Sequence, residues 1–206
     1  MGIPVMILGE SGTGKSYSMR GFTKEQVGVF LVGKPRLPFK NDLACVKSAT
    51  YMAIMKGLAE AKRPTFVIDD SQYLIVNEFF DKAQIKGYDK FTEIALNFRN
   101  LIHFVNHKVP DNVIVYFLHH TQTDENGRLK AKTIGKMLDE KLTVEGCFDI
   151  VMRTEVNQDG YWFRTRNNGN DTVKTPDGMF TDELIPNDLA AVDKAIREYY
   201  GMEAGK

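Results

Sequence analysis

A short glycine-rich segment near the start of the chain has the spacing of a phosphate-binding loop. Residues 9–16 read Gly-Glu-Ser-Gly-Thr-Gly-Lys-Ser and fit the pattern G-x-x-x-x-G-K-[ST]. The glycines let successive backbone N–H groups turn toward one point, where the N-terminus of a following helix would add partial positive charge. We expect Lys15 to reach the β- and γ-phosphates of ATP and the Ser16 hydroxyl to bind Mg²⁺.

The candidate nucleotide contacts are the whole loop and the residue after it: Gly9, Glu10, Ser11, Gly12, Thr13, Gly14, Lys15, Ser16 and Tyr17. The flanking segments fit the motif, because the apolar residues 3–8 precede the loop and no helix breaker follows Lys15 until Gly21. Strand, glycine loop and helix in this order form the arrangement that the motif requires. A glycine-rich turn that merely joins a strand to a helix is the alternative.

Two adjacent carboxylates end another apolar segment, residues 65–70, which reads Thr-Phe-Val-Ile-Asp-Asp. Phosphoryl transfer needs an acid near the Mg²⁺ and a group that orients the attacking water. We therefore expect Asp69 to hold the metal with Ser16, directly or through water, and Asp70 to act as the base. The alternative is that the two acids simply open a surface turn before Ser71.

The expected strand order leaves room for an extra strand between the loop strand and the carboxylate strand, as in the RecA/AAA+ division of P-loop ATPases. In that division a polar residue at the end of the inserted strand senses the γ-phosphate. Here the apolar residues 113–118 run into His119, His120, Thr121 and Gln122, and any of them could have this role. We assign His119 and Gln122 to the catalytic group with Lys15 and Asp70. A histidine that closes the strand with a satisfied hydrogen bond is the alternative.

The next segment is basic in its second half and carries four candidate DNA contacts: Arg128, Lys130, Lys132 and Lys136. A flexible basic loop at this place is where RecA-like proteins contact single-stranded DNA, and backbone phosphates would supply most of the affinity. An exposed loop that its lysines keep soluble explains the same residues.

Later residues suggest two further contacts. Arg153, Arg164 and Arg166 are candidates to reach the γ-phosphate of a neighbouring subunit, or they are structural arginines. The aromatic residues 161–163 could stack on bases or pack on the core as a strand.

Five apolar runs predict the core strands that position these groups: residues 4–8, 27–32, 65–69, 113–118 and 148–153. Helices between them imply a mostly parallel sheet of α/β class, with helices on both faces of a three-layer fold. The first helix begins at Lys15. The second is capped by Asn41 or Asp42 and carries Leu43, Val46, Ala53, Ile54 and Leu58.

The third helix is the clearest, because apolar residues from Phe91 to Val105 recur at i, i+3, i+4 and i+7, and Pro110 ends it. Residues 151–156 and 161–166 predict an antiparallel C-terminal hairpin. Asn187 or Asp188 can cap a last helix, with Gly201 at its end.

Composition sets broad limits. The 206 residues suffice for one domain, with a core at 1–167 and a C-terminal extension at 168–206. Lys+Arg and Asp+Glu both number 27, so any nucleic-acid surface must be local. We expect a cytoplasmic protein, because the two cysteines are far apart and no signal peptide precedes the first strand. We expect no membrane contact, because no apolar run is long enough to span a bilayer.

The chain resembles a bacteriophage family in four places. These are the N-terminal P-loop, residues 67–70, the His-His-Thr strand end, and the tail at residues 164–169 and 174–176. Its members are small RecA-core ATP-binding proteins, called phage AAA or RecA-like single-strand annealing proteins. The resemblance spans most of the chain, but only the P-loop and the carboxylate strand are specific, and many ATPases share both.

The resemblance implies ATP and Mg²⁺ as cofactors, homo-oligomerisation as a ring or filament on single-stranded DNA, and a role in recombination or replication. A single-stranded DNA-binding protein is a further possible partner. RecA has a catalytic glutamate after its second strand, whereas residues 33–36 here read Gly-Lys-Pro-Arg. Hydrolysis then relies on Asp70 or is slow. An AAA+ motor or loader that acts on proteins, and a nucleotide-binding assembly switch with little turnover, are the alternative functions.

Overall fold

A mostly parallel β-sheet of nine strands organises the chain in the computed structural model, which describes residues 1–134 and 143–202. Eight strands lie in the order β3-β2-β4-β5-β1-β7-β8-β9, and β6 pairs with the outer part of β5. The strands are β1 (Ile3–Gly9), β2 (Val27–Leu31), β3 (Ala44–Lys47), β4 (Thr65–Asp69), β5 (Ile114–Thr123), β6 (Leu129–Ala131), β7 (Ile150–Asn157), β8 (Gly160–Arg164) and β9 (Leu184–Pro186).

The strand order confirms the expected insertion, because β5 lies between β1, which leads into the glycine loop, and β4, which ends in the carboxylates. The three strands are parallel, and Gly9 at the end of β1 is level with His120 on β5. Their carboxyl ends therefore meet at one edge of the sheet, as ligand-binding ends do in open α/β sheets.

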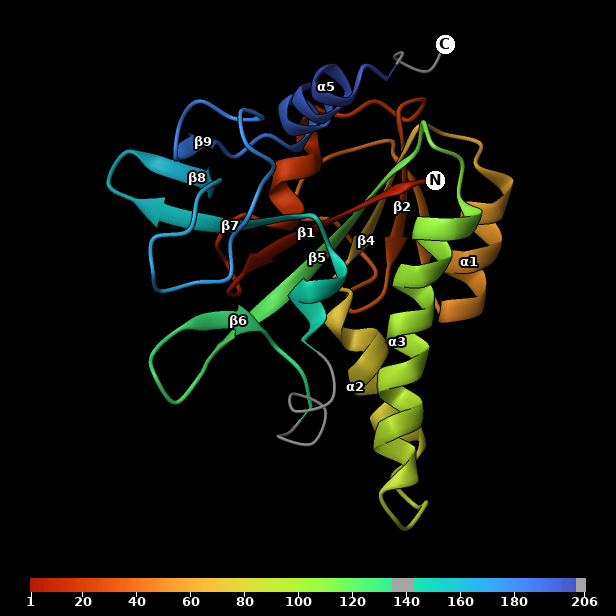
Figure 1. Ribbon diagram of the computed structural model, residues 1–206. Coiled ribbons are helices and arrows are strands. Elements are labelled where there is room, and N and C mark those ends of the chain that lie inside the picture. Colours follow the sequence, from red (N-terminus) through yellow and green to blue (C-terminus); the bar gives the residue numbers. More distant parts are fainter. Residues whose placement is uncertain (135–142, 203–206) are drawn as a thin grey trace.

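Helices cover both faces of the sheet (Figure 1). The helices α1 (Tyr51–Glu60), α2 (Gln72–Asp81) and α3 (Asp89–Lys108) pack on one face, and α5 (Leu189–Tyr200) with the 3₁₀ helix η1 (Ser16–Gly21) packs on the other. A second 3₁₀ helix, η2 (Val144–Cys147), precedes β7. Strand side chains alternate between two buried clusters, so Met6 and Leu8 face α3 whereas Val5 and Ile7 face α5.

Two of the predicted helices are confirmed. The buried side of α3 consists of the periodic apolar residues that predicted it, from Ile94 to Val105. The Asp188 carboxylate accepts hydrogen bonds from the backbone N–H groups of Ala190 and Ala191 at the start of α5, and Gly201 ends the helix with φ of 63°.

A buried ion pair fastens α5 to the sheet. The guanidinium of Arg197 donates to Asp193 at 2.7 Å, to the carbonyls of Asn112 and Pro64 at 2.9 and 2.8 Å, and to the Thr65 hydroxyl at 3.0 Å. The Asp193 carboxylate also accepts from Thr65 and from Tyr116. Every partner of this pair is therefore at the amino ends of β4 and β5 or on α5 itself.

The helix predicted from Asn41 or Asp42 was wrong. Residues Ala44–Lys47 form the edge strand β3 beside β2, and α1 begins only at Tyr51, with the Thr50 hydroxyl as its cap. Leu43 and Val46 therefore do not belong to the helix of Ile54 and Leu58. The spacing of apolar residues could not show this, since pairing with β2 overrides local periodicity.

Three other segments differ from expectation. The helix after the glycine loop is a short 3₁₀ helix, so its dipole is small. The loop expected at residues 123–136 is, in its described part, an antiparallel hairpin in which Thr121–Thr123 pair with Leu129–Ala131. The C-terminal hairpin of β7 and β8 is confirmed, and it is extended by β9. In the described part of the chain, no helix combines the length and apolar character needed to cross a bilayer.

Candidate functional site

The glycine loop between β1 and η1 is shaped by its glycines and by β7. Gly12 and Gly14 have φ of 82° and 92°, which a side chain disfavours. A Cβ at Gly9 would lie 1.9 Å from Oγ1 of Thr154 on β7, so the close approach of the two strands requires glycine. The hydroxyls of Thr13 and Thr154 share a hydrogen bond of 2.6 Å, which ties the tip of the loop to β7.

Lys15 lies inside the loop. Its ammonium donates to the carbonyls of Gly9 at 2.8 Å and Glu10 at 2.7 Å, and the side chain is buried. Burial lowers the pKa of Lys15 to about 8, although the nearby charges of Asp70 and Asp69 oppose the shift. The ammonium is therefore still mostly charged at neutral pH and is held where an anion in the loop would meet it.

Ser16 and Asp69 are brought together from two elements. The Ser16 hydroxyl at the start of η1 donates to Oδ1 of Asp69 at the end of β4, at 2.7 Å. Burial raises the pKa of Asp69 to about 6, with the Ser16 hydrogen bond opposing it. A hydroxyl and a carboxylate oxygen in contact suit Mg²⁺, which takes few protein ligands and keeps waters or phosphate oxygens at its other positions.

Asp70 has a left-handed backbone, with φ of 59°, and its carboxylate turns toward β5. Nε2 of His120 lies 3.2 Å from its Oδ1. Burial alone would raise the pKa of Asp70, but the hydrogen bond and charge of His120, together with Lys15 and Lys34, outweigh it and lower the pKa below its usual value. Asp70 is thus held as a carboxylate beside a histidine at the end of β5.

The two adjacent histidines have different surroundings. His119 is fully buried, and its ring nitrogens contact the Ser71 hydroxyl at 2.9 Å and the Lys132 carbonyl at 2.8 Å. Burial lowers its pKa to about 4, so it is neutral at physiological pH. The geometry thus favours His120 over His119 as the polar group that faces a ligand. Gln122, the other catalytic candidate, lies farther along β5, where it pairs with Lys130 in the hairpin.

A pocket of about 570 Å³ lies over the glycine loop. Its wall includes five residues of the loop: Ser11, Gly12, Gly14, Lys15 and Ser16. The other lining residues are Tyr17, Lys34, Pro38, Asp70, His120 and Tyr161. The volume is in the range of small-molecule sites. Gly9, Glu10 and Thr13, also predicted as contacts, belong to the same loop but do not line this pocket.

A larger hollow, of about 1190 Å³, lies at the other end of β1, beside Gly2, Ile3 and Tyr200. It does not contain the cluster formed by Lys15, Asp70 and His120, so we place the candidate site in the smaller pocket.

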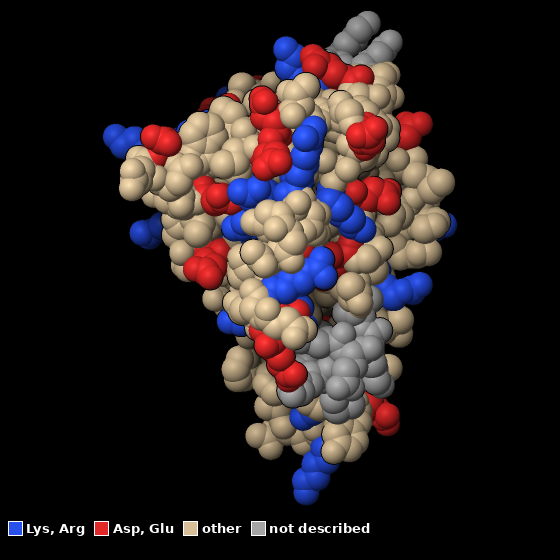
Figure 2. All heavy atoms as spheres, turned by 60° about the vertical axis from the view of Figure 1, so that its left-hand side comes forward, with Lys and Arg blue, Asp and Glu red and all other residues tan. Residues whose placement is uncertain are grey.

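The candidate DNA contacts are on the β5–β6 hairpin, apart from Lys136, which lies outside the described residues. Lys130 and Lys132 are on or next to β6. Arg128 is exposed, but its Nε donates to the Asp171 carbonyl at 2.9 Å. Basic and acidic residues are interspersed on the face that this hairpin shares with β7 and β8 (Figure 2), so it is not a surface of one charge.

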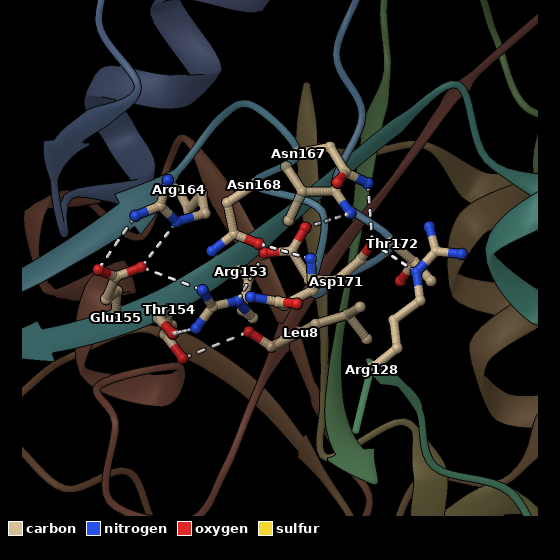
Figure 3. Close-up of polar contacts among 12 residues, drawn as sticks. Leu8, Arg128, Arg153, Thr154, Glu155, Arg164, Asn167, Asn168, Asp171 and Thr172 are labelled. Carbon is tan, nitrogen blue, oxygen red and sulfur yellow. Dashed lines mark hydrogen bonds and ion pairs between the residues drawn. The ribbon is translucent and has the colours of Figure 1, made fainter. Parts of the chain in front are cut away.

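The three candidate arginine fingers all have partners in their own chain. Arg153 contacts Asp171 and Glu155, and Arg164 contacts the same Glu155 at 2.7 Å (Figure 3). Arg166 donates to the carbonyls of Phe180 and Thr181. This network braces the segment after β8.

Sequence reasoning missed three residues of the site. Lys34 and Pro38 line the pocket from the loop after β2, and Thr154 on β7 supports the glycine loop through its hydrogen bond with Thr13. Only Lys34 had a signal in the sequence, because it lies after the second strand, where RecA has a catalytic glutamate. Of the aromatic run, Phe163 is buried in the core whereas Tyr161 lines the pocket.

Comparison with known proteins gives no family. No family model matches the chain, and no curated protein matches it. Among solved structures, it is similar to a DnaB-like replicative helicase studied with primase, at 13% identity and a TM-score of 0.47, over 76% of this chain and 49% of that chain. It is also similar to an ATPase from the type III secretion system of pathogenic bacteria, at 13% identity and a TM-score of 0.42, over 76% of this chain and 51% of that one. The chain thus spans about half the length of these structures, and a likeness of this size assigns it neither activity nor partner.

Proposed function

We propose that this chain is a magnesium-dependent ATPase that binds the triphosphate in the pocket over the glycine loop. The observation that carries the proposal is the meeting of three groups at the ends of neighbouring parallel strands: Lys15 after β1, the Ser16–Asp69 pair at β4, and the Asp70–His120 pair between β4 and β5. Each has the chemistry that one part of a bound Mg-triphosphate needs.

Binding follows from the loop. Its backbone N–H groups and the Lys15 ammonium would hold the phosphates, while Ser16 and Asp69 would hold Mg²⁺. The bound ion would neutralise part of the phosphate charge. The half-exposed rings of Tyr17 and Tyr161, which also line the pocket, offer flat surfaces on which the base would stack.

Hydrolysis would depend on Asp70. A water oxygen attacks the γ-phosphorus, the bond from that phosphorus to the β–γ bridging oxygen breaks, and ADP leaves. The proton that the water loses passes to an oxygen of the transferred phosphate, which leaves as inorganic phosphate. The Asp70 carboxylate accepts a hydrogen bond from the water and orients it. Because its pKa is lowered, Asp70 is a weak proton acceptor, so we expect slow turnover in the isolated protein.

Calorimetric titration of Mg-ATP into the parent protein and Lys15→Ala tests this proposal. We expect the variant to lose binding, because the phosphates lose their point charge. Lys62→Ala, at an exposed lysine that pairs with Glu60, is the matched control and should bind as the parent does. Equal affinity of Lys15→Ala and the parent, with an unchanged melting temperature, would refute the assignment of the loop.

We further propose that the partner is single-stranded DNA, in phage-type recombination or replication, and that the protein acts as a homo-oligomer. The supporting observation is continuity along β5: the strand carries His120 at the pocket and then enters the hairpin with Lys130 and Lys132. A ligand on the hairpin is therefore connected to the pocket through one strand.

ATPase rates measured with and without single-stranded DNA test this part. Stimulation by DNA supports it. Turnover that DNA does not change supports a motor or loader that acts on proteins, and tight binding without turnover supports an assembly switch. Mass photometry with ATP and DNA shows whether a ring or filament forms, and added single-stranded DNA-binding protein tests that partner.

A further inference from the structure

Lys34 is the second lysine of the pocket and enters it from a different element than Lys15. Lys15 comes from the loop after β1, whereas Lys34 follows β2, which is separated from β1 by the two strands β4 and β5. The pocket wall is therefore cationic on two sides, with Asp70 and His120 between them in the strand order.

The backbone before Lys34 is fixed against the carboxylate end of β4. Leu31 is level with Asp69 in the parallel pairing of β2 and β4, and the Val32 N–H donates to the Asp69 carbonyl at 3.2 Å. A Cβ at Gly33 would lie 2.9 Å from Oδ2 of Asp70 and 2.8 Å from the Tyr73 ring. Gly33 thus packs directly on Asp70, which brings Lys34 to the same end of the pocket.

The Lys34 ammonium has no hydrogen bond or ion pair within residues 1–134 and 143–202. Lys15, in contrast, gives two of its donors to loop carbonyls. For both Asp69 and Asp70, burial is the largest single influence on the pKa and acts to raise it. The charge of Lys34 is among the influences that act to lower both pKa values, so its ammonium is within electrostatic reach of both acids. The donors of Lys34 are available to a ligand.

The Lys34 side chain lines the same pocket as Lys15, Ser16 and Asp70. In the proposed binding mode the glycine loop holds the phosphates and the Ser16–Asp69 pair holds Mg²⁺, so the terminal phosphate would lie beside Asp70, on which the residue before Lys34 packs. We propose that the Lys34 ammonium binds the terminal phosphate of a nucleoside triphosphate and makes the site prefer triphosphate over diphosphate. The proposal rests on the nucleotide-binding function proposed above.

The affinities of a non-hydrolysable ATP analogue and of ADP, both with Mg²⁺, test the proposal by calorimetry on the full chain. Lys34→Ala should weaken the analogue about tenfold or more, as loss of a hydrogen bond to a charged group does, and change ADP by less than about twofold. Lys34→Arg should restore most of the difference. Arg36→Ala is the matched control, because Arg36 is a cation on the same exposed loop but does not line the pocket.

Three results would overturn the proposal: no loss in Lys34→Ala, an equal loss for both nucleotides, or the same selective loss in Arg36→Ala, which would indicate only the general field of the loop. Failure of the proposed function looks different. In that case the parent binds neither nucleotide, or Lys15→Ala binds both as well as the parent.

Discussion

Replacing Arg197 by methionine tests the claim that α5 is fastened to the sheet by a buried ion pair. Arg197 and Asp193 are both less than 10% exposed, at 7% and 6%. The substitution leaves the Asp193 charge and two strand-end carbonyls without their partner. Removing one member of such a pair costs about 3–5 kcal/mol of the free energy of unfolding. For a chain of this length, that lowers the melting temperature by roughly 6–20 °C.

Urea denaturation followed by circular dichroism measures this loss. Lys194→Met is the matched control on the same helix, because the Lys194 side chain is 78% exposed and its ion pair with Glu198 spans 3.7 Å. We expect that control to change the free energy of unfolding by less than about 1 kcal/mol. The double variant Asp193→Asn with Arg197→Met should regain part of the loss, because it removes the unpaired charge.

The pH dependence gives a second test with a definite sign. Burial raises the pKa of Asp193, and Arg197 opposes the shift, so removing Arg197 raises that pKa further. An acid whose pKa is higher in the folded state penalises folding when it is charged, and the penalty disappears as the pH falls through that pKa. The stability gap between parent and Arg197→Met should therefore be largest where the Asp193 carboxylate is charged and should narrow as the pH falls through its raised pKa. A gap that is constant with pH, or no larger than that of Lys194→Met, would refute the reasoning.

Two further predictions concern the proposed site. Asp70→Asn should keep Mg-ATP affinity within a few-fold and slow hydrolysis by roughly 100-fold, because the amide cannot orient the water as the carboxylate does, while asparagine tolerates the left-handed backbone. A phosphate-release assay checks this, and a parental rate would move the role elsewhere. If the hairpin binds single-stranded DNA, changing Lys130, Lys132 and Lys136 to glutamine should reduce the slope of log affinity against log salt by about 2, measured by fluorescence anisotropy. Arg128 is kept because it holds the Asp171 carbonyl, and an unchanged slope would mean that the hairpin is only solvated.

Much of the sheet could be predicted from the sequence, because its central strands are apolar runs with clear ends. The predicted range 65–69 is the range of β4, and the periodic residues of α3 predicted its buried side. The edge strand β3 could not be predicted in this way. Its four residues are partly exposed and carry no alternation, so only the neighbouring strand β2 determines their conformation.

In the candidate site, too, local motifs could be predicted from the sequence and long-range contacts could not. The glycine loop and the acids of β4 are local motifs. Lys15, Ser16 and Asp70 line one pocket, and Asp69 contacts the Ser16 hydroxyl. The difference between His119 and His120 depends on which side of β5 each faces, and residues far apart in sequence decide it: Ser71 and Lys132 bind one, and Asp70 binds the other. The role of Thr154 could not be predicted either, because its contact with the glycine loop joins residues far apart in the sequence and no local motif indicates it.

The central position of β1 has a consequence for how the protein is made. β1 leaves the ribosome before its two neighbours, yet Ile3 pairs with Ile114 and Val5 pairs with Ile150. During synthesis its buried side chains have no sheet to enter until most of the chain has followed, and such long-range pairings form slowly. Since Thr154 also supports Gly9 and Thr13, the glycine loop is synthesised before the strand that supports it and is among the last segments to take its native shape. A nascent chain that stalls before β7 would therefore carry the whole phosphate-loop motif and still be unable to form it.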